Sequence, residues 1–132
     1  MSALFADSFY FLALVNSDDS SHTKAVRFEG QTASLVTTEW VLTEVADALS
    51  DKSNRPVFLN LLNALQSSFD TEIIPASHEL FLRGIELFAK RPDKDWSLTD
   101  CVSFVVMKDH GLADALTGDR HFEQAGFNVL LK

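Results

Sequence analysis

Residues 97–122 read SLTDCVSFVVMKDHGLADALTGDRHF and contain the pattern that decides the fold. Ser97 and Asp100 have the spacing of a capping box, which predicts a helix that begins at the serine and ends before a glycine. Apolar residues around most of this helix predict a buried element. A short strand is expected at 112–116, and a turn then leads into another helix. Asp119 therefore follows a strand, at the edge where open α/β sheets place their chemistry.

The same alternation continues on both sides of this stretch. Apolar and β-branched runs predict strands at 4–6, 33–38, 72–75, 112–116 and 127–131. Helical spacing of apolar residues predicts helices at 8–16, 20–29, 39–49, 53–69, 77–90, 97–110 and 120–125. Strands that alternate with helices favour a mostly parallel sheet with helices on both faces. The expected fold is a three-layer α/β/α domain with a central sheet of about five strands.

The composition is that of one compact globular domain over residues 1–132. Hydrophobic residues make up 46% of the chain, yet no apolar run approaches the roughly 20 residues of a membrane span. No basic segment precedes the first apolar residues, which argues against a secretory signal. Cys101 is the single cysteine and cannot form an internal disulfide. We therefore expect it to be a packing residue in a cytoplasmic protein.

The chain is acidic, with 11 Lys and Arg residues against 19 Asp and Glu residues and a net charge of −8. This balance argues against non-specific binding to nucleic acid, which relies on Lys and Arg to neutralise phosphates. A phosphate substrate stays possible if divalent metals supply the positive charge. The acidity also favours a basic protein partner.

Two further acids stand where they could serve chemistry. Asp7 ends the first predicted strand, where it is equally well explained as the N-cap of the next helix. Glu44 lies at the edge of the apolar face of the helix predicted at 39–49, where an unpaired acid is costly. Glu39 and Asp47 of the same helix point elsewhere, and we expect both to be solvated.

Three of the acids are expected at one edge of the sheet. Asp7 and Asp119 follow parallel strands and so emerge on the same side, which Asp100 can also reach. Carboxylates that share a small site raise one another's pKa unless cations offset their repulsion. Oxygen ligands suit Mg²⁺ or Mn²⁺ better than zinc, and two such ions about 4 Å apart could activate a water for phosphodiester hydrolysis. The sequence contains no G-x-S-x-G, Walker lysine or G-x-G-x-x-G motif that would favour another chemistry.

Four segments carry a resemblance that spans nearly the whole chain. They are ADSFYFLALVNSDDSSHTKA, VTTEWVLTEVADAL, SLTDCVSFVVM and ADALTGDRHFEQAGF. Together they resemble the PIN-domain family, and within it the VapC-type ribonuclease toxins of bacterial toxin-antitoxin pairs. The family's four acidic positions fall on Asp7, Glu44, Asp100 and Asp119. The resemblance therefore selects Glu44 over Glu39.

The resemblance implies a metal-dependent endoribonuclease. Such an enzyme cuts RNA by in-line attack of water and leaves a 5′-phosphate and a 3′-hydroxyl. Asp7, Asp100 and Asp119 would be direct or water-mediated ligands of Mg²⁺ or Mn²⁺, and Glu44 would be a ligand or a base.

Hydroxyl and histidine side chains flank these acids. Ser8 and Thr117 match the hydroxyl residues beside the first and last acids of the family, and they could orient the carboxylates by hydrogen bonds. A turn or cap explains each hydroxyl nearly as well. His22 is expected to have a structural role, and His121 is expected to pack with Phe122 on the last helix.

Partners also follow from the resemblance. RNA would be held by local positive charge, for which the candidates are Arg55, Arg91, Lys94 and Arg120, although solvated surface charge explains each of them. A small basic antitoxin would bind through the helices around 53–69 and block the acidic site with a basic side chain. The family also implies a homodimer.

Two other functions stay open at the level of sequence. One is a PIN fold that has lost catalysis and only pairs with a protein partner, although the presence of all four acids counts against it. The other is a phosphatase or phospho-acceptor domain that uses acids with Mg²⁺. Asp7 lacks the second acid two residues on that a D-x-D phosphatase carries, and no adjacent acid pair precedes it.

Overall fold

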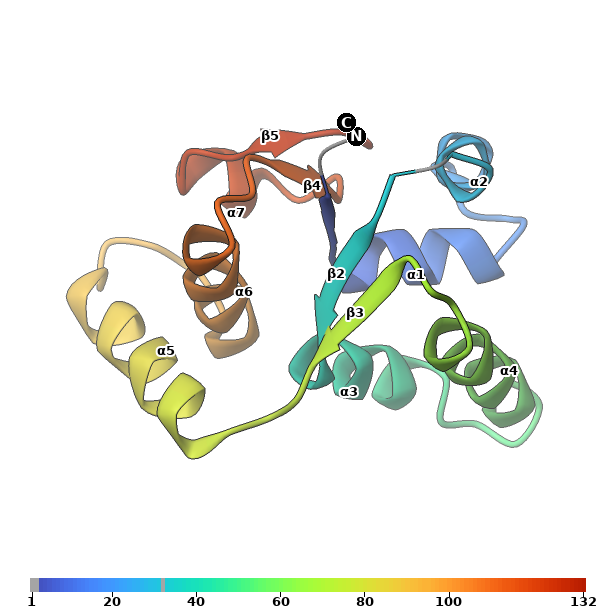
Figure 1. The fold of residues 1–132 in the computed structure, drawn as a ribbon, viewed down its shortest axis with the longest axis horizontal. Coiled ribbons are helices and arrows are strands. Elements are labelled where there is room, and N and C mark those ends of the chain that lie inside the picture. The colour runs from blue at the N-terminus through green and yellow to red at the C-terminus, as the bar shows by residue number, and fades with distance from the viewer. Residues whose placement is uncertain (1–2, 32) are drawn as a thin grey trace.

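The computed structural model describes residues 3–31 and 33–132, which form five strands and seven helices (Figure 1). The strands are β1 (Leu4–Ala6), β2 (Leu35–Thr38), β3 (Thr71–Ile74), β4 (Asp114–Leu116) and β5 (Asn128–Val129). The helices are α1 (Ser8–Val15), α2 (His22–Glu29), α3 (Glu39–Ala48), α4 (Arg55–Gln66), α5 (His78–Lys90), α6 (Leu98–Asp109) and α7 (Arg120–Gln124). In the described part of the chain, none of these helices has the length and apolar content needed to cross a bilayer.

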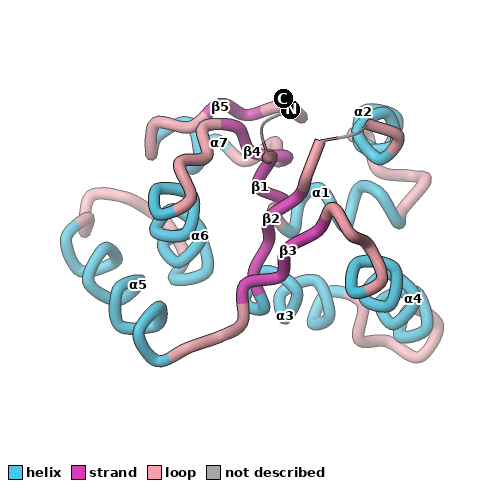
Figure 2. Tube along the Cα trace, in the orientation of Figure 1, coloured by secondary structure: helices cyan, strands magenta, loops and turns pink. Residues whose placement is uncertain are grey.

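The strands form one sheet in the order β3-β2-β1-β4-β5, and every neighbouring pair is parallel. The chain steps outward from β1 to β3 and then crosses back to place β4 and β5 on the other side of β1. Because parallel crossovers are right-handed, this reversal places α1 to α4 on one face and α5 to α7 on the other. Figures 1 and 2 show the two groups of helices on opposite sides of the sheet. The predicted three-layer α/β/α fold is confirmed, with a sheet that is wholly parallel.

Several elements are shorter than the sequence pattern predicts. β5 contains only Asn128–Val129. Before α4, the side chains of Ser53 and Asn54 donate hydrogen bonds to the carboxylate of Asp51 and hold a turn, so the helix begins at Arg55. Local polar turns of this kind set element boundaries, and the spacing of apolar residues does not register them.

The predicted deep helix is α6, which packs between α5 and the sheet. Cys101 and Val102 are fully buried, and Cys101 is the packing residue that its position predicted. The ring of Phe104 meets that of Phe122 edge to face, with centroids 4.9 Å apart. Gly84 allows α5 to approach closely, because a Cβ at this position would lie 2.6 Å from Cγ2 of Val102. The start of α6 is therefore held firmly in place.

The strand order reverses between β1 and β4, so the residues that follow these two strands lie side by side. The N–H of Asp7 donates to the carbonyl oxygen of Leu116 at 3.3 Å, which joins the ends of the two strands. In open parallel sheets such a reversal opens a crevice at the carboxyl ends of the strands. Asp7 and Asp119 are both placed at this edge.

Candidate active site

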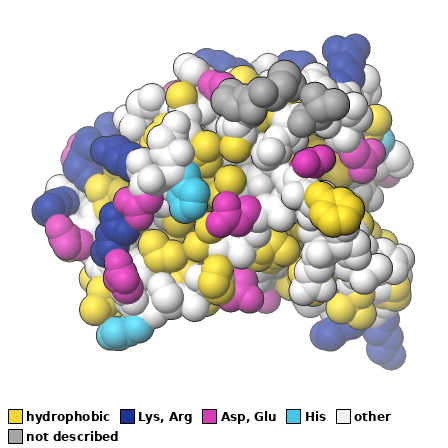
Figure 3. Space-filling model, viewed as in Figure 1, with side chains coloured by type: hydrophobic (Ala, Val, Ile, Leu, Met, Phe, Trp, Pro, Cys, Tyr) yellow, Lys and Arg dark blue, Asp and Glu magenta, His cyan; other side chains and the backbone are white. Residues whose placement is uncertain are grey.

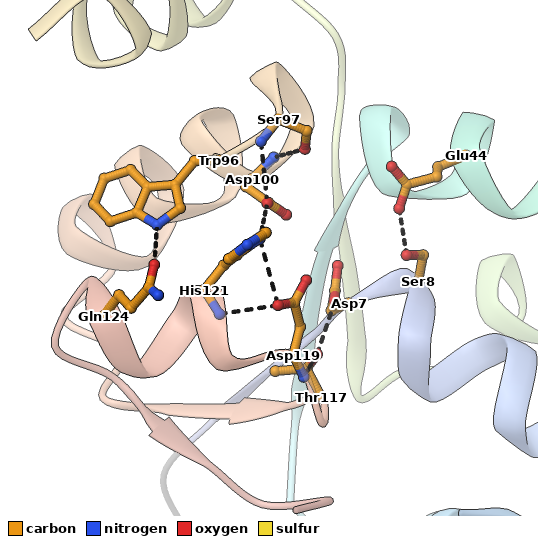
Figure 4. Close-up of polar contacts among 10 residues, drawn as sticks. All are labelled: Asp7, Ser8, Glu44, Trp96, Ser97, Asp100, Thr117, Asp119, His121 and Gln124. Atoms are coloured by element: carbon orange, nitrogen blue, oxygen red, sulfur yellow. Dashed lines mark hydrogen bonds and ion pairs between the residues drawn. The ribbon is translucent and has the colours of Figure 1, made fainter. Parts of the chain in front are cut away.

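Asp7 lies between β1 and α1 on the carboxyl edge of the sheet (Figure 4). Only 4% of its surface is exposed. Within the described residues its side chain caps no amide of α1, and Oδ2 instead accepts a hydrogen bond from Oγ1 of Thr117 at 2.9 Å. Asp7 is the N-cap residue of α1, as one of the two interpretations of the sequence predicted, but in the described part of the chain its side chain forms no capping bond. Asp7 is a buried acid at the crevice.

The environment of Asp7 opposes its ionisation. Burial raises the pKa of Asp7 to about 7, because an ionised carboxylate loses hydration there, and the charges of Asp100 and Glu44 also raise it. The hydrogen bond from Thr117 acts in the opposite direction. The ionised form therefore needs a neighbouring cation for full compensation near neutral pH.

Asp100 reaches the same edge from the first turn of α6. The capping box is present, because Oγ of Ser97 accepts from the N–H of Asp100 at 3.0 Å and Oδ2 of Asp100 accepts from the N–H of Ser97 at 3.2 Å. Burial raises the pKa of Asp100, the bond from Ser97 lowers it, and the charge of Asp119 raises it. The cap therefore holds a carboxylate that is also part of the acidic cluster.

Thr117 connects the acids that follow the two central strands. Its Oγ1 donates to Asp7 and accepts from the N–H of Asp119 at 3.1 Å. Asp119 is the N-cap of α7, where its Oδ1 accepts from the N–H of His121 at 2.9 Å. One hydroxyl group therefore links the carboxylate of Asp7 to the backbone of Asp119.

His121 lies inside the cluster, so the expectation that it packs with Phe122 is wrong. Its Nδ1 is 3.1 Å from Oδ2 of Asp100 and 3.4 Å from Oδ1 of Asp119 (Figure 4). One ligand atom from each of these three residues lies within 4.8 Å of the other two. The sequence signal was the position of His121 two residues after an acid at a helix start. Its contact with α6, which is distant in sequence, could be seen only in the tertiary structure.

Glu44 approaches the crevice from the opposite side. It lies on α3, is exposed, and accepts a hydrogen bond from the hydroxyl of Ser8, which directly follows Asp7 (Figure 4). Glu44 therefore stands at the mouth of the site, outside the group formed by Asp100, Asp119 and His121. Glu39, the other acid considered on this helix, instead accepts from the N–H of Ala76 at 2.6 Å.

The four basic residues considered for RNA binding do not lie together. Arg91 pairs with Asp93 at 3.0 Å and lies over the ring of Trp96, and Lys94 is 3.9 Å from the same aspartate. Basic side chains interleaved with acidic ones cover the side of the molecule formed by α5 and α6, at the left of Figure 3. Arg120 begins α7 next to Asp119, whereas Arg55 begins α4 on the other face of the sheet.

A protein-family model described as PIN domain matches residues 4–128. The chain belongs to the PIN-domain family. The matched region includes Asp7, Glu44, Asp100 and Asp119, so the resemblance drawn from the four sequence segments is confirmed at the level of the family.

This PIN domain is similar to the 23S rRNA-specific endonuclease VapC20 of Mycobacterium tuberculosis, from strains CDC 1551 and H37Rv. The two sequences are 26% identical over 125 residues, which cover 94% of this chain and 95% of VapC20. The crystal structure of M. tuberculosis VapC20, described as a Sarcin-Ricin loop cleaving toxin, superimposes with a TM-score of 0.84 at 24% identity, over 94% of this chain and 95% of that one.

Two more distant structures share the fold. VapBC2 from Rickettsia felis, solved with a DNA fragment from its promoter, has a TM-score of 0.68 at 14% identity. FitAcB from Neisseria gonorrhoeae has a TM-score of 0.64 at 16% identity. Each similarity covers 98% of this PIN domain and 96% of the other chain.

The donor set of the PIN domain fits a divalent cation. The carboxylates of Asp7, Asp100 and Asp119 offer the oxygen ligands that Mg²⁺ and Mn²⁺ prefer. The imidazole of His121 adds a nitrogen, which Mg²⁺ accepts less readily than the transition metals do. The raised pKa of Asp7, caused first by burial, is also the property of a group whose ionised form a bound cation would stabilise.

Proposed function

We propose that this PIN domain is a divalent-metal-dependent endoribonuclease and the toxin of a toxin-antitoxin pair. The observation that carries the proposal is the meeting of Asp7, Asp100 and Asp119 at one edge of the sheet, with Glu44 beside them. The similarity to VapC20, which is named as an rRNA endonuclease, supports RNA as the substrate.

In this proposal the acids have distinct roles. Bound Mg²⁺ or Mn²⁺ would supply an activated water and neutralise the charge of the phosphodiester. Asp100 and Asp119, which lie close together, would hold the cation, and Asp7 would complete the set of carboxylates. Glu44, exposed at the mouth, would ligate the cation or accept a proton from the attacking water.

Neighbouring groups would orient these acids. The hydroxyl of Ser8 would orient the carboxylate of Glu44. The hydroxyl of Thr117 would orient the carboxylate of Asp7, and it also accepts from the backbone N–H of Asp119. Arg120, next to Asp119, is the basic residue best placed to meet the RNA backbone, and Arg91, Lys94 and Arg55 would contribute less.

Cleavage of ribosomal and transfer RNA by the purified protein tests the proposal. We expect cuts in the presence of Mg²⁺ or Mn²⁺ and at least about a 100-fold loss of rate in Asp119→Asn. Asp18→Asn, an exposed acid in the loop before α2, is the matched control and should cleave as the wild type does. Cleavage that survives both removal of divalent metal and the Asp119→Asn change would overturn the metal assignment.

Calorimetric titration with Mn²⁺ addresses the competing function, a PIN fold that only binds a partner. An enzyme of this class should bind Mn²⁺ at the crevice, and Asp100→Asn should weaken that binding. A folded protein that binds no divalent metal would favour the binding module.

We further propose that a small basic antitoxin binds over α4 and that the toxin is a homodimer. Leu59 on α4 is 61% exposed and Phe69, just after this helix, is fully exposed. The net charge of −8 favours a basic partner. Co-purification with the product of the neighbouring reading frame should be weakened by Leu59→Ser, with the exposed Asn60→Ser as the control. If both variants capture the partner equally well, α4 is not part of the interface.

The cytoplasm is the proposed location of this activity. The free thiol of Cys101 suits a reducing compartment, and RNA is the proposed substrate. Fractionation of cells that express the protein checks this expectation.

A further inference from the structure

An open cleft of about 370 Å³ lies beside the acidic crevice. It is lined by residues of α3, by Ala76 in the segment before α5, and by Thr99 in the first turn of α6. Glu44 belongs to both the cleft and the proposed catalytic site, and Thr99 of the cleft precedes Asp100. The volume lies within the range of about 300 to 1,000 Å³ that small-ligand sites occupy. The cleft therefore adjoins the acids through Glu44 and Thr99.

The lining of the cleft selects against phosphate. Its charged residues are Glu39, Glu44 and Asp47, and none of the described residues that line it carries a positive charge. Trp40 is the aromatic residue of the lining, and it is partly buried against the core. A planar ring held against core residues, with carboxylates around it, is suited to a flat, uncharged group that has N–H donors.

One carboxylate of the cleft is free to bind such donors. Glu39 accepts from the N–H of Ala76, and Glu44 accepts from Ser8. Asp47 is exposed, and in the described part of the chain no ion pair engages it. Its two oxygens can accept two parallel hydrogen bonds from adjacent donors. Among the four RNA bases, guanine presents such a pair on its Watson–Crick edge, at N1–H and the N2 amino group.

We propose that this cleft is a guanine subsite, in which Trp40 stacks on the base and Asp47 accepts from its N1–H and N2–H groups. The inference rests on the proposed ribonuclease function, because the bound nucleotide adjoins the phosphate held at Asp7, Asp100 and Asp119. Single-stranded RNA is commonly read in this way, by stacking on aromatic side chains and hydrogen bonding to base edges. The subsite would direct cleavage next to an unpaired guanine.

Short single-stranded RNAs with one variable position test the subsite. For the wild type, we expect guanine at the preferred position to give the highest kcat/KM, and inosine, which lacks the N2 amino group, to lower it about 10-fold. Asp47→Asn should lose about 10-fold or more on the guanine substrate and should no longer distinguish guanine from inosine. Asp47→Glu should recover part of the discrimination, and Asp18→Asn should behave as the wild type.

The Mn²⁺-dependent hydrolysis of bis(p-nitrophenyl) phosphate, which has no base, separates this inference from the proposed function. Wild-type protein that fails to hydrolyse both RNA and this ester contradicts the ribonuclease itself. If the ester and all RNAs are cleaved equally well by the wild type and Asp47→Asn, the guanine subsite is wrong. If Asp47→Asn leaves base preference unchanged but weakens binding of an arginine-rich peptide, the cleft is a protein contact and the inference is overturned.

Trp40 provides a second variant for the same test. Trp40→Leu should raise KM for the guanine substrate about 10-fold with little change in kcat, since stacking contributes roughly 1 to 3 kcal/mol per base. Thermal unfolding of the variant checks that it is folded. A KM for RNA that does not change in this variant would contradict stacking at Trp40.

Discussion

Asp7 gives up its hydration when the chain folds, and the charges of Asp100 and Glu44 make its ionisation still less favourable. The hydrogen bond from Thr117 stabilises the ionised form of Asp7 and so offsets part of this cost. The residue is therefore a point where stability and proposed function oppose each other. Such opposition is typical of active sites, where carboxyl groups with shifted pKa values cluster.

The pH dependence of the free energy of unfolding should reveal the cost of burying Asp7. Between about pH 4 and pH 7 the folded state keeps a proton on Asp7 that the unfolded state has released, so the free energy of unfolding falls as the pH rises. The asparagine side chain of Asp7→Asn does not ionise, so this pH dependence is absent from the variant. Its stability relative to the wild type should increase by about 2 to 4 kcal/mol from pH 4 to pH 8 in metal-free urea unfolding experiments. Parallel pH profiles would contradict the burial of an ionisable Asp7, and Mn²⁺ should narrow the difference at pH 8.

His121 gives a second prediction for a single residue. Its Nδ1 contacts Asp100 and Asp119, so His121→Asn should lower Mn²⁺ affinity about 10-fold or more, as loss of groups around a metal commonly does. The exposed His78 on α5 is the matched control, and His78→Asn should leave the affinity unchanged. Calorimetric titration measures both. Equal affinity in the two variants would show that His121 only packs at the site.

At the scale of elements, two serine N-caps, each of which accepts a hydrogen bond from the amide three residues on, test what α6 does. Oγ of Ser97 accepts from Asp100 at the start of α6, and Oγ of Ser77 accepts from Leu80 at the start of α5. Replacing either serine by alanine should lower the free energy of unfolding by about 1 kcal/mol. Ser97→Ala alone should also weaken Mn²⁺ binding, because it releases Asp100 from the capping box. Equal Mn²⁺ affinity in both variants would show that the Ser97 cap does not position Asp100 for metal binding.

The turn between β4 and α7 gives another matched pair. A Cβ on Gly118 would lie 2.5 Å from the ring of Phe9, whereas a Cβ on Gly30 would meet no atom within 4 Å. Gly118→Ala should therefore cost about 1 to 3 kcal/mol of stability and displace Asp119, while Gly30→Ala should be nearly neutral. Thermal unfolding and Mn²⁺ titration measure the two effects. A Gly118→Ala variant as stable as Gly30→Ala would show that Phe9 moves aside at little cost.

At the scale of the whole molecule, the apolar surface that remains exposed is concentrated on α5. Phe81, Leu82, Ile85 and Phe88 are each about two fifths to one half exposed. Large exposed apolar side chains that gather on one helix favour an interaction surface there. We expect the proposed homodimer to form through this helix, with Phe88→Ser reducing the molar mass in light scattering to one subunit. Leu59→Ser on α4 is the control and should stay dimeric, and a monomeric wild type at high concentration would contradict the dimer.

The fold was largely predictable because its signals are local. Alternating apolar runs and helices specify a parallel α/β sheet, and the Ser97 to Asp100 spacing specifies the start of α6. Element ends were less predictable, as at Asp51, because short-range side-chain bonds set them. The roles of single acids were less predictable still. The spacing of apolar residues in a strand or helix does not show whether an acid beside them is buried or solvated.

The sequence by itself determined the family, the order of strands and helices, and four acids placed after strands or at helix starts. The tertiary structure decided how these acids are held. It joined Asp7 to Asp119 through Thr117, brought His121 against Asp100, and left Glu44 at the mouth. The physical reason is that spacing along the chain governs hydrogen bonds within an element. Contacts between residues more than 100 positions apart, such as Asp7 and Thr117, depend on how the strand order reverses at the centre of the sheet.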